Sequence, residues 1–239
     1  EQMQTLNSIA CVPAYYQDNL LAILLLGEKE DKSRFDQEEL DFYAALASDA
    51  AMAIRNAQLF ANLKRELERN RELFLQTILV LGSTIEAKDT YTHGHTERVT
   101  NYAVLIARQM RESGAPELDD KFLEVLYISG MLHDIGKIAV PEAILNKTDK
   151  LTREEFDIMK QHTLKGEEML KPLSVFRECI DGVKYHHERY DGKGYPSGLK
   201  GEEIPMIAAI IAVADTFDAM TTDRPYRKGF SKDEAIAEI

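Results

Sequence analysis

Cysteine is scarce in this sequence of 239 residues, which contains only Cys11 and Cys179. The pair does not form the spacing of a metal-binding or redox-active cysteine motif. So few cysteines fit a reducing compartment, where disulfides are rare. We therefore expect two thiols that take no part in the chemistry.

Long apolar runs are absent as well. The longest covers residues 20–26 and ends at Gly27 and Glu28, far short of the roughly 20 residues that cross a bilayer. No signal peptide is visible at the start of the sequence. We expect no membrane segment in this fragment and a cytoplasmic location. Both ends look cut, so an anchor beyond them stays an open alternative.

Positive charge is in deficit, because 29 basic residues face 41 acidic ones and the net charge is −12. Nucleic-acid polymers bind mainly through neutralisation of their phosphates, so we expect no polymeric nucleic acid as a partner. A small phosphate substrate would need a local positive centre. Apolar residues make up 44% of the chain, enough for a folded core.

The N-terminal part of the sequence has a pattern of strands followed by a helix. Two short apolar runs, residues 9–16 and 20–27, are joined by residues 17–19 and predict a β-hairpin. Asp36, followed three residues later by Glu39, is typical of a helix N-terminus.

An unbroken helix is predicted over residues 58–85. Its seam positions recur at alternating steps of three and four, the rhythm of a coiled coil. They are Phe60, Leu63, Leu67, Asn70, Phe74, Thr77 or Ile78, Leu81 and Ile85. A helix that packs on its own domain is the alternative, but we favour a dimeric signalling helix.

The rest of the chain is almost entirely helical in pattern, with glycine and proline between the runs. The helical runs cover residues 101–112, 121–132, 153–170, 175–187 and 205–220. The expected fold class is therefore α+β overall: an α/β module, a long linker helix and an all-α helical bundle.

All six histidines lie in this helical part. Five of them and two aspartates form a set of metal-ligand types: His95, His133, Asp134, His162, His186, His187 and Asp215. Helical bundles build metal sites from such side chains on facing helices. Imidazole and carboxylate together suit a first-row divalent metal such as iron, manganese or zinc.

These signals differ in specificity. His133 and Asp134 point about 100° apart on a helix and can approach one cluster from two sides, with Asp134 bridging two metals. Taken alone, such a pair is more often a core histidine bonded to a carboxylate. Residues 186–196, two histidines followed by a glycine-rich loop, are a stronger signal, although a solvated turn is the alternative. Asp215 in an apolar helix needs a partner, either a metal or an arginine.

Five segments in order resemble the HD-GYP phosphodiesterases, a subset of the HD metal-hydrolase superfamily. They are YTHGHTERV (residues 91–99), HDIGKIAVP (133–141), MKQHTLKGEEML (159–170), HHERYDGKGYPSGLKGEEIP (186–205) and AVADTFDAMTTDRPYRKG (212–229). The segments LLAILLLGEK (20–29) and FDQEELDFYAALASDAAMAIRNAQLF (35–60) resemble the C-terminal half of a GAF sensor domain. A generic α/β dimerisation module is the alternative there.

The resemblance implies three parts. Residues 1–57 would be the C-terminal part of a GAF domain with an unknown small ligand, residues 58–85 a linker helix that forms a homodimer, and residues 86–239 the HD-GYP domain.

The resemblance also assigns roles. The seven histidines and aspartates above would be metal ligands, with Asp134 bridging. Further roles in catalysis and substrate binding would fall to Lys137, Gly194, Tyr195, Pro196, Arg224 and Arg227. Arg98 would be structural, and His93 a surface residue. Tyr91 stands one turn before His95, and Glu86 and Asp89 are further back and are not expected to reach a third metal. Two metals, iron or manganese, are therefore expected rather than three.

The implied reaction is metal-dependent hydrolysis of the bacterial second messenger cyclic di-GMP to pGpG and, in a second round, GMP. Two alternatives stay open. One is an HD hydrolase of another nucleotide phosphate ester, and the other is a module that binds cyclic di-GMP without cleaving it.

Overall fold

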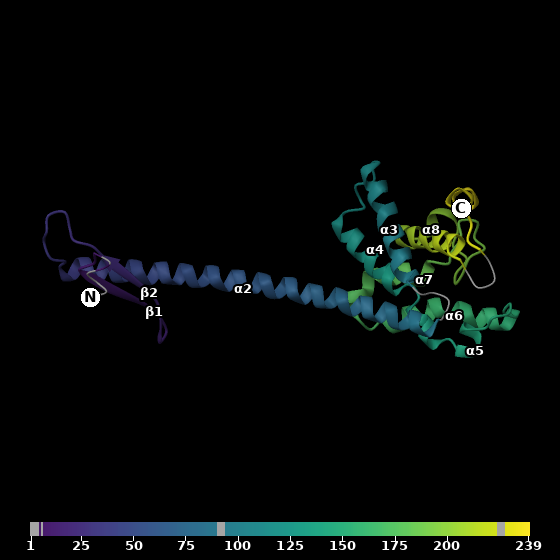
Figure 1. Cartoon of the computed structure of the whole chain (residues 1–239), viewed down its shortest axis with the longest axis horizontal. Coiled ribbons are helices and arrows are strands. Elements are labelled where there is room, and N and C mark those ends of the chain that lie inside the picture. The colour runs from purple at the N-terminus through teal and green to yellow at the C-terminus, as the bar shows by residue number, and fades with distance from the viewer. Residues whose placement is uncertain (1–4, 6, 90–93, 224–227) are drawn as a thin grey trace. The chain divides into compact units, whose positions relative to one another are not determined.

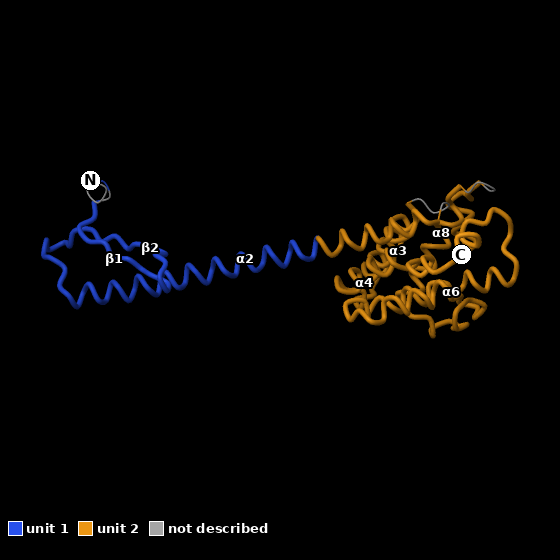
Figure 2. The backbone as a smooth tube through the Cα atoms, turned by 90° about the horizontal axis from the view of Figure 1, so that it is seen from below, with its two compact units in different colours: residues 1–72 blue, residues 73–239 orange. Residues whose placement is uncertain are grey.

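The chain is described from a computed structural model, which covers residues 5, 7–89, 94–223 and 228–239. These residues fall in two compact units, residues 1–72 and residues 73–239 (Figure 2). Each unit has its own hydrophobic core.

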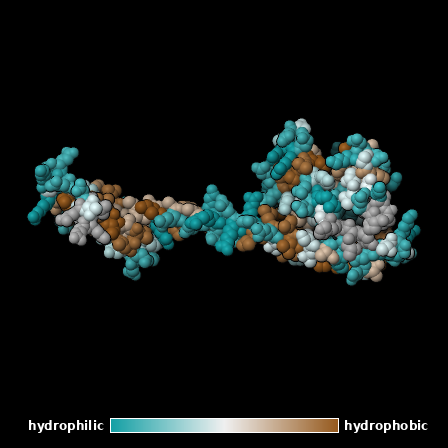
Figure 3. All heavy atoms as spheres, in the orientation of Figure 1, coloured by the Kyte–Doolittle hydropathy of each residue, from teal (hydrophilic) through white to brown (hydrophobic). Residues whose placement is uncertain are grey.

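The first unit contains the predicted hairpin. Strand β1 (Ala10–Tyr16) pairs antiparallel with β2 (Asn19–Leu26). One face of the hairpin buries Val12, Ala14 and Leu26 against Ala47 and Ala51 of the following helix. Figure 3 shows hydrophobic side chains gathered over this part of the molecule.

Helix α2 (Gln37–Lys88) runs without a break for 52 residues. Its start confirms the predicted cap, because the backbone N–H of Glu39 donates to Asp36 while that of Asp36 donates to the Glu39 carboxylate, both at 2.9 Å. These reciprocal bonds satisfy N–H groups that a helix start otherwise leaves unpaired.

The predicted seam of α2 divides into two parts. Phe60, Leu63 and Leu67 are 73%, 56% and 61% exposed. Ile78 and Ile85 are buried at 1% and 6%. Of the later seam residues, Ile78 packs inside the second unit, where Phe74 also stacks on Phe176 at 5.9 Å between ring centroids, whereas Leu81 is 41% exposed. The heptad pattern therefore reflects, in its last turns, packing of the helix on its own domain.

The second unit is a bundle of short and medium helices (Figure 1). After α2 they are α3 (His95–Glu112), α4 (Asp120–Leu132), η1 (Ile135–Ala139), α5 (Glu142–Leu145), α6 (Arg153–Leu170), η2 (Ser174–Cys179), α7 (Ile180–Tyr185), η3 (Gly201–Glu203), α8 (Met206–Thr221) and α9 (Lys232–Glu238). In the described part of this unit no strand is present, as the sequence predicts.

Two boundaries differ from the sequence-based expectation. Helix α3 begins at His95, earlier than residue 101, because the Glu86 carboxylate accepts the backbone N–H groups of Gly94 and Thr96 and caps the helix. Because Glu86 lies on α2, the local pattern of α3 does not show this cap. The run predicted over residues 175–187 is divided into η2 and α7.

Two apolar clusters meet on α4. One joins α3, α4 and α8, and the other joins the end of α2, α4, η2 and α7. This packing holds the C-terminal end of α4, and the residues directly after it, at the centre of the bundle. Among the described residues, no helix combines the length and apolar character needed to span a bilayer.

Candidate metal centre

The predicted ligands come together at the ends and inner faces of five helices. His95 begins α3, His133 and Asp134 follow α4, and His162 lies within α6. His186 and His187 follow α7, and Asp215 lies on α8. Of this set, His95, His133, Asp134, His162 and His186 are buried, and His187 and Asp215 are partly exposed.

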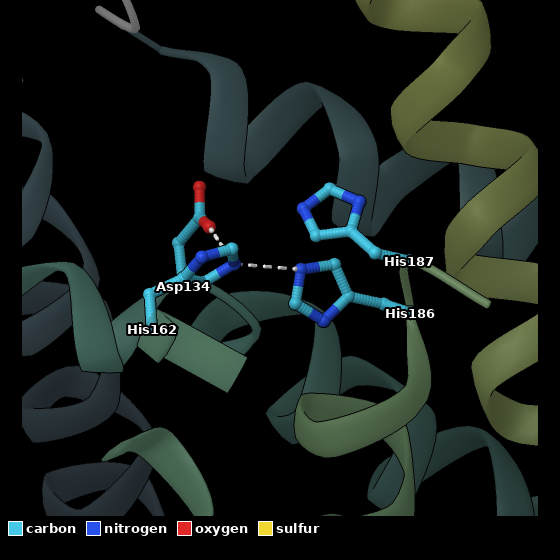
Figure 4. Close-up of side chains that lie close together, drawn as sticks. All are labelled: Asp134, His162, His186 and His187. Carbon is cyan, nitrogen blue, oxygen red and sulfur yellow. Dashed lines mark hydrogen bonds and ion pairs between the residues drawn. The ribbon is translucent and has the colours of Figure 1, made fainter. Parts of the chain in front are cut away.

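The ligand atoms form two groups, each with all its atoms within 4.8 Å of one another. One group holds Asp134, His162, His186 and His187, whose side chains face one another in Figure 4. Nε2 of His162 lies 3.4 Å from Nε2 of His186. The other group holds His95, His133 and Asp215.

The two aspartates connect the groups. Oδ1 of Asp134 is 3.5 Å from Nε2 of His162, while its Oδ2 is 3.4 Å from Nε2 of His133. Oδ1 of Asp215 is 3.2 Å from Nε2 of His95, while its Oδ2 is 3.8 Å from Nδ1 of His187. Each carboxylate thus offers one oxygen to each group, as a bridging ligand of a two-metal site does.

The rings of three histidines are oriented by backbone carbonyls. Nδ1 of His133, His162 and His186 donates to the carbonyl three residues earlier, at 2.6, 2.8 and 2.8 Å. These bonds place the ring proton on Nδ1 and leave Nε2 as a lone-pair donor, the state that binds a metal.

Nε2 of His133 is buried and, within the described part of the chain, has no hydrogen-bond partner. A buried polar atom without a partner is costly unless something else binds it. A divalent ion fits this atom, because imidazole nitrogen and carboxylate oxygen are ligands of first-row metals. The donor set of both groups therefore suits metal ions.

The site sets the protonation of its histidines in two ways. Burial lowers the pKa of His162, lowers that of His186 well below its usual range, and lowers that of His187 to about 4. Burial alone would also lower the pKa of His95, but the carboxylates of Asp215 and Asp218 raise it to about 9. At neutral pH and without metal, the first three rings are neutral and His95 carries a proton.

Asp218, a residue with no role predicted from the sequence, orients His95. Its Oδ2 is 2.7 Å from Nδ1 of His95 and its Oδ1 accepts from Nε of Arg98 at 2.7 Å. A carboxylate behind a metal-bound histidine fixes the ring and strengthens it as a ligand. Arg98 therefore has the structural role expected of it, acting through Asp218, which stands one helical turn after Asp215.

Lys137 lies between two carboxylates. Its Nζ is 2.8 Å from Asp134 and donates to Asp89, also at 2.8 Å. Burial alone would lower the pKa of Lys137, but the two carboxylates raise it, so the side chain stays an ammonium. Asp89, which was not expected to reach a third metal, belongs to neither group of candidate ligands but does reach the cavity. It is 5% exposed and lines the same cavity as Asp134, because the last turn of α2 brings it there.

The glycine-rich loop after His187 is built around Glu188. The carboxylate of this buried residue accepts the backbone N–H groups of Ser197, Gly198 and Leu199. A Cβ on Gly194 would lie 2.3 Å from the backbone nitrogen of Arg189, so only glycine fits there. Glu188 was not singled out in the sequence, although it follows the histidine pair directly.

The GYP segment of this loop lies beside the candidate metal centre. The ring of Tyr195 is 4.8 Å from that of His187 between centroids, and the bond from Tyr195 to Pro196 is cis. Burial raises the pKa of the Tyr195 hydroxyl. Tyr195 therefore presents a neutral aromatic surface next to His187.

A cavity of about 760 Å³ opens over the candidate metal centre. Its wall includes His95, Asp134, His187 and Asp215, together with Asp89, Lys137 and residues 147–151. Residues 147–151, which include Lys147 and Lys150, had not been predicted to face the site. Arg224, Arg227, Tyr91 and His93 lie outside the described residues.

The curated proteins similar to this chain carry related names. The chain is 40% identical over 185 residues to cyclic di-GMP phosphodiesterase response regulator RpfG of Xanthomonas campestris pv. campestris, covering 76% of this chain and 46% of that protein. It is 42% identical over 156 residues to cyclic di-GMP phosphodiesterase PA4108 of Pseudomonas aeruginosa, covering 65% and 36%. It is 40% identical over 167 residues to 3'3'-cGAMP-specific phosphodiesterase 3 of Vibrio cholerae, covering 70% and 35%.

The chain spans less than half of the length of these three relatives. The profile of the HD domain family matches residues 80–239, which is more than half of the chain and includes every ligand of the two groups. The chain belongs to the HD domain family.

Proposed function

We propose that this chain is an HD-GYP phosphodiesterase that hydrolyses cyclic di-GMP with the help of two divalent metal ions. The observation that carries the proposal is the pair of aspartates, each with one oxygen toward each group of histidines. Relatives named cyclic di-GMP phosphodiesterases support the choice of substrate.

The metal ligands of the proposed enzyme are the seven residues of the two groups. Bound divalent ions supply Lewis-acid activation of water near neutral pH and neutralise charge on a phosphate. Iron or manganese is the proposed metal, because both accept mixed imidazole and carboxylate ligands. Asp89 adds a carboxylate to the cavity wall but is bonded to Lys137, which favours two ions over three.

The remaining residues serve the substrate. The Lys137 ammonium, which faces the cavity beside Asp134, stabilises negative charge on the reacting phosphate. Gly194, Tyr195 and Pro196 shape a wall for a guanine base. Arg224 and Arg227 bind phosphate through forked hydrogen bonds. These positive groups would offset the net charge of −12. Opening of the cyclic dinucleotide gives pGpG, and a second cleavage gives GMP.

Protein purified without oxygen provides the test. Its metal content is measured, and the same sample is given cyclic di-GMP, 3'3'-cGAMP and a nucleoside phosphate ester, with products separated by chromatography. Turnover of cyclic di-GMP that depends on bound metal supports the proposal. Preference for 3'3'-cGAMP would favour the other substrate, which one relative at 40% identity is named for.

A binding module without catalysis is the remaining candidate. Isothermal titration with cyclic di-GMP, run beside the product assay, separates binding from turnover. Tight binding of cyclic di-GMP by metal-loaded protein, without formation of product, would indicate a binding module and contradict the proposed enzyme.

Metal uptake at pH 7 is expected to release at least one proton per chain, because carboxylates raise the pKa of both His95 and His133. The pKa of His95 is raised to about 9 without metal, so the ring is protonated at pH 7 and must lose that proton before it binds an ion. The apparent affinity should therefore weaken at least about tenfold for each unit that the pH falls below 9. Calorimetry in two buffers with different ionisation enthalpies measures the release.

Asp218→Asn is the matched variant for this measurement, because it removes one of the three carboxylates that raise the pKa of His95. The number of protons released should fall in this variant. Uptake with no proton release in the unaltered protein would contradict the assignment of His95.

The first unit is proposed to be the C-terminal part of a GAF sensor domain with a small ligand, and α2 to dimerise. The exposed apolar side chains of the hairpin, among them Tyr15, Leu20 and Ile23, are compatible with a larger sheet. The exposed seam residues of α2 support a two-helix contact. Movement of the paired helices would then regulate the hydrolase.

Replacing Leu63 and Leu67 together by serine is expected to convert the dimer to a monomer. Both side chains are more than half exposed in the single chain, so their loss costs a partner contact and little of the fold. Light scattering measures the mass. Glu66→Ser and Glu68→Ser together form the control on the same turns. A double leucine variant that stays dimeric would contradict the seam.

A further inference from the structure

Lys88, the last residue of α2, donates hydrogen bonds from its ammonium group to the end of the short helix η1 and to the residue after it. Its Nζ donates to the backbone carbonyls of Lys137, Ile138 and Val140 at 3.2, 2.7 and 2.7 Å. An ammonium has three N–H donors, and here each has an acceptor. These carbonyls belong to the C-terminal end of η1 and to Val140 directly after it, where partial negative charge favours a cation.

The same turn of α2 also holds the Lys137 side chain. Asp89, the next residue, accepts from Nζ of Lys137 at 2.8 Å. The backbone N–H of Asp89 donates to Ile85 and Glu86, so this residue continues the helical turn of α2. Lys137 is therefore bound at two points by adjacent residues: its carbonyl by Lys88 and its ammonium by Asp89.

A further bond connects this end of α2 to the loop that follows α5. Nδ2 of Asn146 donates to the carbonyl of Lys88 at 3.0 Å. Ile85, one turn earlier on α2, is 6% exposed and anchors the helix in the second unit. The end of α2 is thus a rigid support, and η1 rests on it through charge-assisted bonds.

We propose that Lys88 is a positioning residue for Lys137, and that it places the catalytic ammonium at the cavity by holding the backbone of η1. The inference rests on the proposed function, in which Lys137 contacts the reacting phosphate. An error of about 1 Å in the place of a catalytic group can cost about 100-fold in rate. Because α2 is continuous from Gln37 to Lys88, a shift of its last turn would act on Lys137 directly.

The competing role for Lys88 is to cap η1 and stabilise the fold, with no specific effect on Lys137. A double-mutant cycle distinguishes the two roles, since residues that act through one another are not additive. The variants are Lys88→Met, Lys137→Met and the double variant. Lys88→Arg keeps several N–H donors and serves as the conservative variant. Lys165→Met, on the surface of α6 and paired with Glu168, is the control.

With metal-loaded protein and cyclic di-GMP, Lys88→Met is expected to lower kcat about tenfold or more, by analogy with other misplaced catalytic groups. KM and metal content should stay within about twofold. In the Lys137→Met background the same change should have no further effect on kcat. Lys88→Arg should recover most of the activity, and Lys165→Met should match the unaltered protein.

Equal losses of kcat in both backgrounds would overturn the proposal, as would full activity of Lys88→Met. Hydrogen exchange provides a readout that needs no turnover. Lys88→Met should speed exchange of the backbone N–H groups of Lys137 and Val140 without changing that of α8, and unchanged exchange in η1 would also overturn it. If the unaltered metal-loaded protein does not cleave cyclic di-GMP, the proposed function fails and the exchange result still decides whether Lys88 holds η1.

Discussion

Asp134→Asn is expected to remove metal binding and hydrolysis of cyclic di-GMP together. Loss of a residue that only hydrogen-bonds to a metal ligand costs roughly 10–100-fold in activity. Asp134 is itself a proposed ligand, so the kcat should fall by more than this. The reason is the position of its two oxygens, 3.4 Å from Nε2 of His133 and 3.5 Å from Nε2 of His162. A neutral amide keeps one weak oxygen and replaces the other by NH2, so one group loses its carboxylate oxygen and the other keeps only an uncharged one.

Metal analysis by mass spectrometry and a product assay on the same sample measure these effects. Asp120→Asn is the matched control, because the Asp120 side chain is 96% exposed and pairs only at the surface with Arg111. Its metal content and kcat should equal those of the unaltered protein. Full activity of Asp134→Asn with added manganese would show that Asp134 does not bridge.

Gly136→Ala is expected to have the largest effect on stability. A Cβ on Gly136 would lie 1.8 Å from the carbonyl oxygen of His162 and 2.6 Å from the backbone nitrogen of Gly166. Both atoms are backbone of α6, so a rotamer change cannot relieve the contact. We expect the free energy of unfolding to fall by more than about 4 kcal/mol, the range reserved for a severe packing defect. The Tm of the second unit would drop by about 8 °C or more.

Thermal unfolding of metal-free protein, followed by circular dichroism, measures this loss. Gly82→Ala is the graded comparison, because its Cβ would lie 3.0 Å from the carbonyl oxygen of Met131. That contact needs only a small shift, so its cost should be clearly smaller. Equal stability of the two variants would contradict the close packing of η1 on α6. Any folded Gly136→Ala protein should also show reduced metal binding, since His162 lies at the contact.

The sequence predicted the candidate ligand set because several of these residues are neighbours within one segment. His133 with Asp134, and His186 with His187, stand side by side in the chain, and both pairs lie at a helix end in the structure. The hairpin and the Asp36 cap were predicted for a similar reason, since they depend on a few neighbouring residues. Local rules were sufficient for these features.

Other site residues could not be identified from local pattern. Asp89 faces Lys137, 48 residues further along the chain, and Asp218 faces His95 across 123 residues. The heptad rhythm likewise does not say whether a seam residue meets a second chain or the same domain. Ile78 meets its own domain, whereas Leu63 stays exposed.

The sequence alone determined the kinds of side chain available for chemistry: imidazoles and carboxylates in helical segments, one lysine three residues after Asp134, and a glycine-rich loop after His187. Only the tertiary structure decided which oxygen faces which ring, that Asp89 reaches the cavity, and that Lys88 supports η1. The physical reason is that helix periodicity sets directions within one element. The packing of α4 between two apolar clusters sets the distances between elements.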